Sequence, residues 1–421
     1  MIATGKRILL LTYGSRGDVE PFIALGLGLL EAGHAVRLVC PAPYAPLAEA
    51  RGLEVAPIEG NPDELAQAFA DRAGLNGAKM VVSMMQHVLP LATRVFAAVQ
   101  AAGQDADLIV HSFLMTDAGH TLARMRGVPD VSAQFFPVFL PTADFASLTL
   151  PDLPLGPAYR RATHAFNTAV FRYGARLMYA SLRRSHPELP ALAPWLLRAP
   201  VRPETALIYA YSPQVLPRPA EWPPSAHVTG YWQVPLPAGW QPPDGLARFL
   251  ESGPPPVYFG PGSMSSAKLP ALLREVAAAA RACGQRLVLG LPPESIGPEL
   301  RGDDLIAAGG VPHAWLFPRM GFILHHGGAG TTGSAAAAGV PNSAVPFSAD
   351  QSFWARQIVR LGLGPTAPDA HHLTRAGIET VLREGLGDPA YRQRAAALGE
   401  RVREEDGTAA AVGVIQALLS R

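Results

Sequence analysis

The 421-residue sequence predicts an α/β fold, in which parallel strands alternate with helices. The run Ile8–Thr12 is apolar except for its last residue, which is typical of a strand buried on both faces of a parallel sheet. A glycine-rich turn, a helical apolar pattern at Pro21–Ala32 and a second apolar run at Ala35–Cys40 complete a βαβ unit. A strand, a glycine-containing turn and a helix follow one another again after Pro256.

The remaining elements follow from the same patterns of apolar residues and turn residues. Residues 136–157, rich in proline and aromatic residues, are expected to be irregular. Further strands are expected at 54–58, 108–111, 131–134, 207–211, 256–259, 286–290 and 322–325, and helices at 62–102, 158–198, 269–283 and 389–421.

A change in composition divides the chain. Prolines are dense from Pro213 to Pro243, as expected of a linker between domains. The sequence therefore predicts a first domain at 1–215, a linker at 216–243 and a second domain at 244–400. The last segment, 401–421, is expected to be helical.

Composition excludes several classes of protein. The net charge of +1 does not favour a nucleic-acid partner. Cys40 and Cys283 match no metal-binding spacing and fit a reducing compartment. No run approaches the ~20 apolar residues of a membrane span. We expect a cytoplasmic protein whose apolar composition allows weak contact with a membrane surface; the sequence does not indicate an oligomeric state.

The strongest local feature is the segment His325–Thr332, at a predicted turn from strand to helix. Its glycines let the backbone approach a ligand, and the free N–H groups of a helix N-terminus attract anions. A pyrophosphate would fit, with His326 and Thr331 as additional donors. A tight turn with close helix packing explains the same residues, and the lysine of a phosphate-binding P-loop is missing.

This segment resembles the donor signature of family 1 glycosyltransferases with the GT-B fold. The most similar branch holds sterol glucosyltransferases and the glycosyltransferases of glycopeptide antibiotics. The resemblance implies two facing Rossmann-like domains, an acceptor domain followed by a nucleotide-sugar domain. It also implies that the C-terminal helix, 401–421, packs back on the first domain. The matching segments occur in family order along nearly the whole chain, at Thr12–Pro21, Val228–Trp232, Val311–Arg319, His325–Thr332 and Val345–Trp354.

In this branch the aspartate of the Arg-Gly-Asp sequence is the catalytic base, so the resemblance implies that Asp18 takes the proton of the acceptor hydroxyl. From the residues alone, Asp18 suits a cap of the helix near Pro21 equally well. Ser15, Arg16 and Gly17 are expected close to the phosphates or the acceptor.

The resemblance also implies a set of donor-binding residues in the second domain. Asp350 and Gln351 would hold sugar hydroxyls, although a helix cap explains them too. Gly310 stands where many relatives carry an aromatic residue that stacks on the base, and Ser334 replaces an acidic residue that binds the ribose. The remaining donor positions are Gly262 and Ser263, Val311 and His313 beside the base and ribose, and His326, Gly328, Ala329, Gly330 and Thr331 at the phosphates.

An apolar acceptor pocket is expected in the first domain, where core packing is the alternative for each side chain. Its candidates are Met84, Phe135, Phe136 and Phe139. The other histidines show no ligand spacing and are expected to be packed or exposed, and a single Asp117 is weak evidence for a site.

The expected activity is an inverting transfer of a hexose, glucose first, from a UDP-sugar to a hydroxyl of a lipophilic small molecule. No metal and no cofactor besides the nucleotide sugar are expected, because the helix start would stabilise the departing diphosphate. The alternatives are a transferase of TDP-deoxysugars or rhamnose, an epimerase of the same fold, and a non-catalytic protein that binds a nucleotide sugar or a lipophilic ligand.

Overall fold

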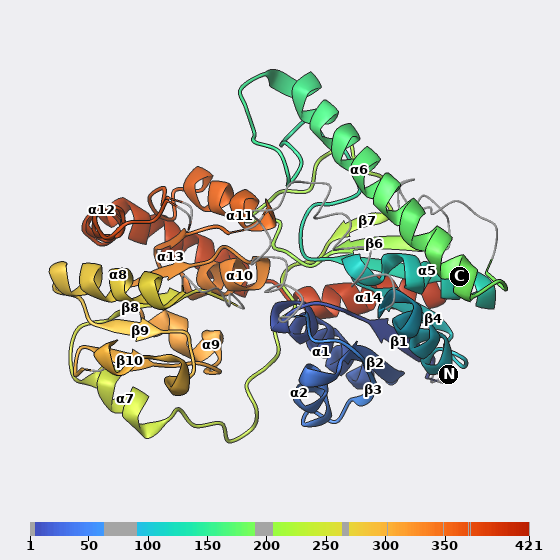
Figure 1. The fold of residues 1–421 in the computed structure, drawn as a ribbon, viewed down its shortest axis with the longest axis horizontal. Helices are drawn as coiled ribbons and strands as arrows, with labels where there is room; N and C mark the ends of the chain where they lie inside the picture. The colour runs from blue at the N-terminus through green and yellow to red at the C-terminus, as the bar shows by residue number, and fades with distance from the viewer. Residues whose placement is uncertain are drawn as a thin grey trace. The chain divides into compact units, whose positions relative to one another are not determined.

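The computed structural model describes residues 5–62, 91–189, 205–262, 269–300, 302–347, 349–368, 370 and 372–420. The chain forms two compact units (Figure 1). Unit 1 comprises Met1–Tyr211, Arg218–Val234 and Asp406–Arg421, and unit 2 comprises Ser212–Pro217 and Pro235–Glu405.

Unit 1 is built on a seven-stranded parallel sheet with the strand order β3-β2-β1-β4-β5-β6-β7. Three of the inner strands, at residues 108–111, 130–134 and 205–209, are buried along their whole length. The strands are β1 (Arg7–Leu11), β2 (Ala35–Pro41), β3 (Glu54–Ile58), β4 (Leu108–His111), β5 (Asp130–Gln134), β6 (Thr205–Tyr209) and β7 (Ala226–Val228).

The helices of unit 1 cover this sheet, and the C-terminal helix packs directly on the first one. A Cβ at Gly28 of α1 would come within 2.7 Å of Thr408 in α14, so the two helices approach closely. The α-helices are α1 (Arg16–Glu31), α2 (Ala45–Glu49), α5 (Thr116–Arg126), α6 (Gly156–Ser185) and α14 (Gly407–Leu419), and the short 3₁₀ helices are η1 (Ala42–Tyr44) and η2 (Phe113–Met115).

Unit 2 holds a second parallel sheet, with the order β10-β9-β8-β11-β12. Its strands are β8 (Val257–Gly260), β9 (Leu287–Leu289), β10 (Leu305–Ala307), β11 (Phe322–His325) and β12 (Asn342–Ala344). Its helices are α7 (Asp244–Glu251), α8 (Leu269–Ala282), η3 (Pro293–Ser295), η4 (Pro298–Leu300), α9 (His313–Leu316), η5 (Phe317–Arg319), α10 (Ala329–Ala338), α11 (Ala349–Arg360), α12 (Arg375–Gly387) and α13 (Pro389–Arg403).

The predicted α/β class and each predicted strand are confirmed, but some boundaries differ. Helix α1 begins at Arg16 rather than near Pro21, because Ser15 and Asp18 cap it earlier. The segment predicted as linker contains β7, which pairs with β6. The predicted C-terminal helix is two helices, separated at residues 404–406.

Two predicted helices lie partly outside the described residues. Of the helix expected at 62–102, residues 91–102 are described and helical. Of the helix expected at 158–198, α6 accounts for the part up to Ser185. The stretch 136–157 has no regular element before α6 begins at Gly156, as predicted. Within the described ranges, no helix combines the length and apolarity needed to cross a bilayer.

A buried polar network joins four elements of unit 1. Asp130 of β5 accepts a hydrogen bond at Oδ1 from the Thr205 hydroxyl of β6 (2.9 Å). Its Oδ2 lies 3.0 Å from Nε2 of His111 at the end of β4 and 2.6 Å from Nδ1 of His120 in α5. All three charged or ionisable side chains are buried. A buried carboxylate needs such partners, so this network fixes α5 against the sheet.

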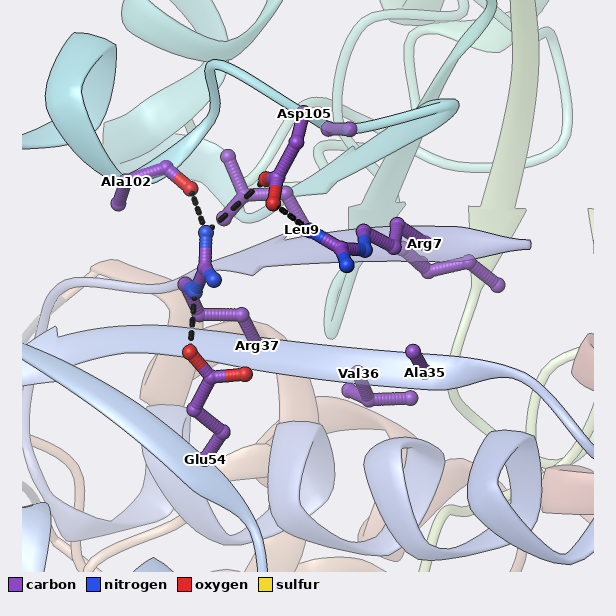
Figure 2. Close-up of a pocket in the computed structure, with 10 residues that line it drawn as sticks. Arg7, Leu9, Ala35, Val36, Arg37, Glu54, Ala102 and Asp105 are labelled. Carbon is purple, nitrogen blue, oxygen red and sulfur yellow. Dashed lines mark hydrogen bonds and ion pairs between the residues drawn. The ribbon is translucent and has the colours of Figure 1, made fainter. Parts of the chain in front are cut away.

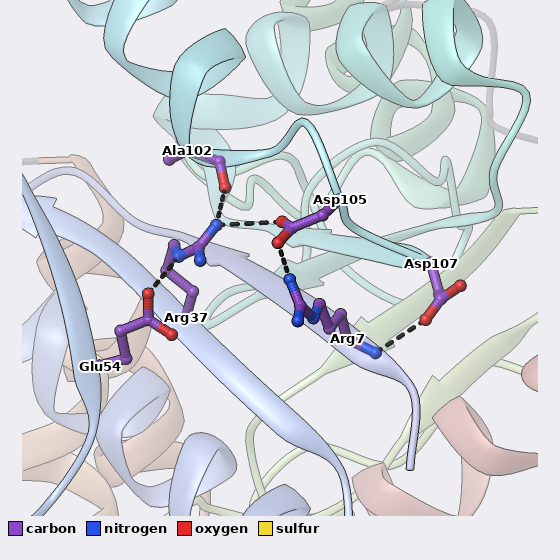
Figure 3. A network of polar contacts seen from close by, with 6 residues as sticks. All are labelled: Arg7, Arg37, Glu54, Ala102, Asp105 and Asp107. Carbon is purple, nitrogen blue, oxygen red and sulfur yellow. Dashed lines mark hydrogen bonds and ion pairs between the residues drawn. The ribbon is translucent and has the colours of Figure 1, made fainter. Parts of the chain in front are cut away.

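A charged pocket lies at the amino-terminal ends of β1, β2 and β4, and Figure 2 shows the residues that line it. Arg37 forms ion pairs with Glu54 (2.6 Å) and Asp105 (3.0 Å) and donates to the carbonyl of Ala102 (2.6 Å). Arg7 also pairs with Asp105, and Figure 3 shows the whole network. Because these groups satisfy one another, we assign them a structural role.

Helix α5 can pack this closely only because residue 119 is glycine. A Cβ there would lie 2.7 Å from Cβ of His111, whose ring Asp130 holds in place. Gly119→Ala is expected to lower the free energy of unfolding by about 2 kcal/mol through this overlap. Gly174→Ala on α6 is the control, since no atom lies within 4 Å of its new Cβ. Urea unfolding measures both, and equal effects would contradict the assigned packing.

Candidate functional site

The glycine loop of unit 2 lies where β8 and β11 end side by side. His326 follows β11, and its ring lies between two glycines. A Cβ at Gly262 would come within 2.6 Å of this ring, and one at Gly328 within 2.4 Å of its Nε2. Gly262 also has a φ of 68°, which glycine adopts without strain. Both glycines are therefore required by the ring.

Burial lowers the pKa of His326 to about 4, and a hydrogen bond to the Gly260 carbonyl opposes this shift. The imidazole is neutral at pH 7 as a result. Its Nδ1 is buried and has no hydrogen-bond partner among the described residues. A buried polar atom without a partner is costly, and such atoms are common where a ligand supplies the missing bond.

Helix α10 begins directly after this ring, with Gly328 as its N-cap residue. The backbone N–H groups of Ala329, Gly330 and Thr331 have no acceptor within the helix, because they belong to its first turn. Together with the helix dipole they favour an anion at this end. The structure thus brings His326 and the four predicted residues 328–331 to one place.

A second histidine, His325, is fully buried and supports the backbone of the loop. Its Nδ1 accepts the backbone N–H of Gly327 (3.1 Å), so the proton resides on Nε2, opposite Oδ1 of Asn342 in β12 (3.4 Å). Asn342 in turn donates to the carbonyl of Val340 (3.0 Å). Burial, and next the charge of His326, lower the pKa of His325 to about 3, so the ring acts as a neutral acceptor.

The loop is also packed against the pair Asp350 and Gln351 in the first turn of α11. A Cβ at Gly327 would lie 2.9 Å from the carbonyl oxygen of Gln351, which shows how close the two segments are. The side-chain Oε1 of Gln351 accepts the backbone N–H of Phe347 (2.8 Å). Gln351 therefore ties the start of α11 to the loop that precedes the helix.

The residues expected beside the nucleotide base lie at the start of α9. The ring of His313 stacks on Phe317 (4.1 Å between centroids, 14° between planes), and its Nε2 lies 3.4 Å from the Tyr258 hydroxyl. Val311 is half-buried just before it, and Gly310 is exposed with a φ of 79°. Trp315 packs against Trp240 and the Arg319 guanidinium rather than standing free.

In unit 1, Asp18 lies in the first turn of α1, beyond the carboxyl end of β1. Its Oδ2 accepts the backbone N–H of Ser15 (2.8 Å) and the Ser15 hydroxyl (3.1 Å). Gly14 has to be glycine, because a Cβ there would lie 2.2 Å from the same oxygen. Arg16 is exposed and pairs with Glu20 (2.7 Å). Asp18 is thus half-buried and held in one orientation.

A second carboxyl group, Asp117, lies in the first turn of α5, beyond the carboxyl end of β4. Burial raises its pKa to about 7. β4 is the neighbour of β1 in the sheet, so both carboxyl groups belong to the same edge. A raised pKa of this kind is frequent at functional sites. The burial that raises it could not be predicted from the sequence, in which Asp117 is a single carboxyl group without a recognisable partner.

Half-buried phenylalanines gather near this edge. The ring of Phe113, directly after β4, contacts Phe136 (5.4 Å), Phe139 (5.7 Å) and Phe171 of α6 (5.4 Å). Phe139 has a φ of 77°, which is unusual for a residue with a side chain. Phe135 instead packs in the core with Phe22 and Trp232. The sequence had not singled out Phe113 or Phe171.

Comparisons with known proteins agree with this geometry. Residues 8–116 match the N-terminal domain of glycosyltransferase family 28, and residues 294–418 match the erythromycin biosynthesis protein CIII-like C-terminal domain. The chain is 34% identical to O-mycaminosyltylonolide 6-deoxyallosyltransferase of Streptomyces fradiae, over 97% of both chains. The chain belongs to the GT-B glycosyltransferases. It is therefore an enzyme that binds a nucleotide-sugar donor and an acceptor.

Two further proteins are similar to this glycosyltransferase. A sterol 3-beta-glucosyltransferase of Neosartorya fischeri is 31% identical over 98% of the chain, which spans 29% of that longer protein. The crystal structure of the calicheamicin glycosyltransferase CalG4 has a TM-score of 0.71 at 19% identity, with 99% of each chain covered. The predicted GT-B fold is thereby confirmed.

Two of the predicted site residues, Ser263 and Met84, lie outside the described residues. Two of the histidines expected to be packed or exposed, His111 and His120, are buried and packed. His111 and His120 converge on Asp130, and these three side chains could hold a metal ion. Their N–O distances of 3.0 and 2.6 Å are those of hydrogen bonds, which already satisfy the carboxylate.

His325 provides a first test of the site. His325→Leu leaves the Gly327 N–H buried without an acceptor, at a cost of about 1–3 kcal/mol. We expect it to weaken nucleotide binding about tenfold or more, as measured by calorimetry. His325→Asn keeps an acceptor oxygen about where Nδ1 stands and should restore most of the affinity. Wild-type affinity in the leucine variant would show that the loop needs no such support.

The raised pKa of Asp117 predicts a pH-dependent stability. Between about pH 4 and pH 7 the folded state holds a proton there that the unfolded state has lost, so stability falls as the pH rises. The full shift corresponds to about 4 kcal/mol, and we expect about half of it because the side chain keeps some contact with solvent. Asp117→Asn should therefore stabilise the protein by about 2 kcal/mol at pH 8 and leave it unchanged at pH 4.

Urea unfolding at the two pH values measures this difference. The exposed Asp144 supplies a matched variant, Asp144→Asn, whose effect should be small at both. An equal effect of Asp117→Asn at pH 4 and pH 8 would refute the raised pKa.

Proposed function

We propose that this glycosyltransferase moves a hexose, glucose in the first instance, from a UDP-sugar to a hydroxyl of a lipophilic natural product such as a sterol or polyketide. The observation that carries the donor site is the His326 ring between Gly262 and Gly328, with a buried Nδ1 at the start of α10. This arrangement suits a diphosphate, whose charge needs N–H donors.

In the proposed reaction the acceptor oxygen attacks the anomeric carbon while the bond from that carbon to the diphosphate oxygen breaks. The acceptor proton goes to the Asp18 carboxylate, and the nucleoside diphosphate leaves with the electron pair of the broken bond. His326 and the N–H groups of residues 329–331 would stabilise its developing charge without a metal ion. Single displacement inverts the configuration of the sugar.

The partly buried rings of Phe113, Phe136 and Phe139 support a lipophilic acceptor. Aromatic side chains that are not fully covered form the apolar walls of small-molecule sites. Asp117 lies at the same sheet edge and would help to orient the acceptor hydroxyl or the base. Asp350 and Gln351 are proposed to bind hydroxyl groups of the sugar.

A second candidate is the transfer of a deoxysugar from a TDP-sugar. The similarity to a 6-deoxyallosyltransferase over nearly its whole length favours it. Thermal unfolding with UDP, TDP and their glucose conjugates, in the presence of a chelator, separates the two. A nucleotide at about 100 times its Kd stabilises the fold by about 2.7 kcal/mol. No shift with any nucleotide would overturn the donor site.

Asp18→Asn tests the base. The amide oxygen of asparagine can keep the hydrogen bonds from Ser15, so stability should change by less than about 1 kcal/mol. The amide cannot take a proton, and kcat should fall about 10²- to 10⁴-fold while donor affinity is retained. Undiminished turnover in this variant would exclude Asp18 as the base.

A further inference from the structure

Helix α6 of unit 1 has an apolar face that no described element covers. Phe166, Val170 and Tyr173 are 57%, 51% and 69% exposed. Their spacing of four and three residues places them on one side of the helix. Leu155, at the N-cap position and 64% exposed, continues the same side. We call Leu155, Phe166, Val170 and Tyr173 the outer stripe of α6.

The opposite side of α6 accounts for its packing in unit 1. His164 and Asn167 are buried, and they contact the preceding loop through the Phe145 carbonyl (3.0 Å) and the Thr149 hydroxyl (2.8 Å). Phe171 on this side meets Phe113. At 100° per residue, the outer stripe, measured from Phe166, lies about 140° to 160° around the helix from Phe171 and His164, and about 100° from Asn167. It is therefore separate from the aromatic cluster proposed to bind the acceptor.

The members of the outer stripe share one side of a helix, unlike single apolar residues scattered over a surface. The 18 residue steps from Leu155 to Tyr173 correspond to about 27 Å along the helix. Figure 1 shows that the first turns of α6 project beyond the sheet of unit 1. Contiguous exposed apolar surface marks a contact with a protein or a membrane.

The charge of α6 favours a membrane. Residues 156–185 contain six arginines and no acidic residue. Arg160 and Arg161 pair with Asp152 and Glu221, at 2.8 Å in each case. In the part of the chain that the structure describes, Arg176, Arg183 and Arg184 are exposed with no carboxylate at ion-pair distance.

A helix with an apolar stripe beside unpaired cationic side chains has the features of one that lies in the plane of a lipid surface. We propose that α6 docks unit 1 on an anionic lipid bilayer. The outer stripe would enter the interface between head groups and acyl chains, and the arginines would contact the head-group phosphates. Docking would bring the acceptor domain to the phase in which a lipophilic acceptor is concentrated, although it does not depend on the identity of that acceptor.

Co-sedimentation of the full chain with vesicles tests this proposal. We expect binding to vesicles of phosphatidylcholine and phosphatidylglycerol, weak binding to phosphatidylcholine alone, and a decrease as salt is added. Each arginine near such a surface contributes about fivefold to binding, so Arg183→Gln/Arg184→Gln should lose about twentyfold. Phe166→Ser/Tyr173→Ser should lose about tenfold or more.

Matched variants elsewhere provide the controls. Arg392→Gln/Arg401→Gln removes two exposed arginines of α13, and Leu236→Ser/Val359→Ser removes two exposed apolar side chains of unit 2. Both should bind vesicles as the wild type does, and thermal unfolding checks that every variant is folded. Absence of binding to anionic vesicles would overturn the proposal. So would a concentration-dependent dimer that Phe166→Ser/Tyr173→Ser abolishes without any change in vesicle binding, since the outer stripe would then join two copies.

Discussion

The arrangement of strands in the two sheets determines where chemistry is possible in this glycosyltransferase. In each sheet the first strand lies in the interior, and later strands are added on both sides of it. β1 therefore lies between β2 and β4, and β8 lies between β9 and β11. The loops after neighbouring strands then run to opposite sides and leave space between them at the carboxyl edge. Asp18 and Asp117 lie at this position in unit 1, and Gly262 and His326 lie at the corresponding position in unit 2. The charged side chains that line the pocket at the amino ends of β1 and β2 pair with one another instead.

The conformation of the glycine loop of unit 2 depends on the positions that lack a side chain as much as on the side chains that are present. His326 occupies its position because Gly262 and Gly328 have no Cβ, and Gly327 permits contact with the Gln351 backbone. Two neutral histidines then have separate roles. His325 accepts the backbone N–H of Gly327, and the His326 ring lies between Gly262 and Gly328. Burial, which lowers the pKa of both rings, keeps them from repelling each other as cations and leaves them as directed hydrogen-bonding groups.

The sequence predicted the parallel sheets and the glycine loop because their signals are local. An apolar run such as Ile8–Leu11 identifies a buried strand, and the glycine-rich segment after a strand predicts the turn into a helix that the structure contains. What it could not predict depends on contacts between distant segments. His111 and His120 are meaningful only through Asp130, the raised pKa of Asp117 arises from burial, and three-residue strands such as β12 have too few residues to show a period. Phe113 joins the aromatic cluster only when α6 brings Phe171 to it.

Two residues for which the sequence left a structural and a functional interpretation open show why the two need not compete. Asp18 accepts hydrogen bonds from Ser15 at one carboxylate oxygen, and Gln351 holds the Phe347 N–H with its amide oxygen. A carboxylate has about four acceptor sites, and an amide has two donors besides its oxygen, so a cap uses only part of either group. The first turn of a helix beyond a parallel strand is the place where a polar side chain is both needed as a cap and directed to the carboxyl edge. These hydrogen bonds thus orient both side chains before any substrate arrives, as the proposed roles of Asp18 as base and Gln351 as sugar-binding group require.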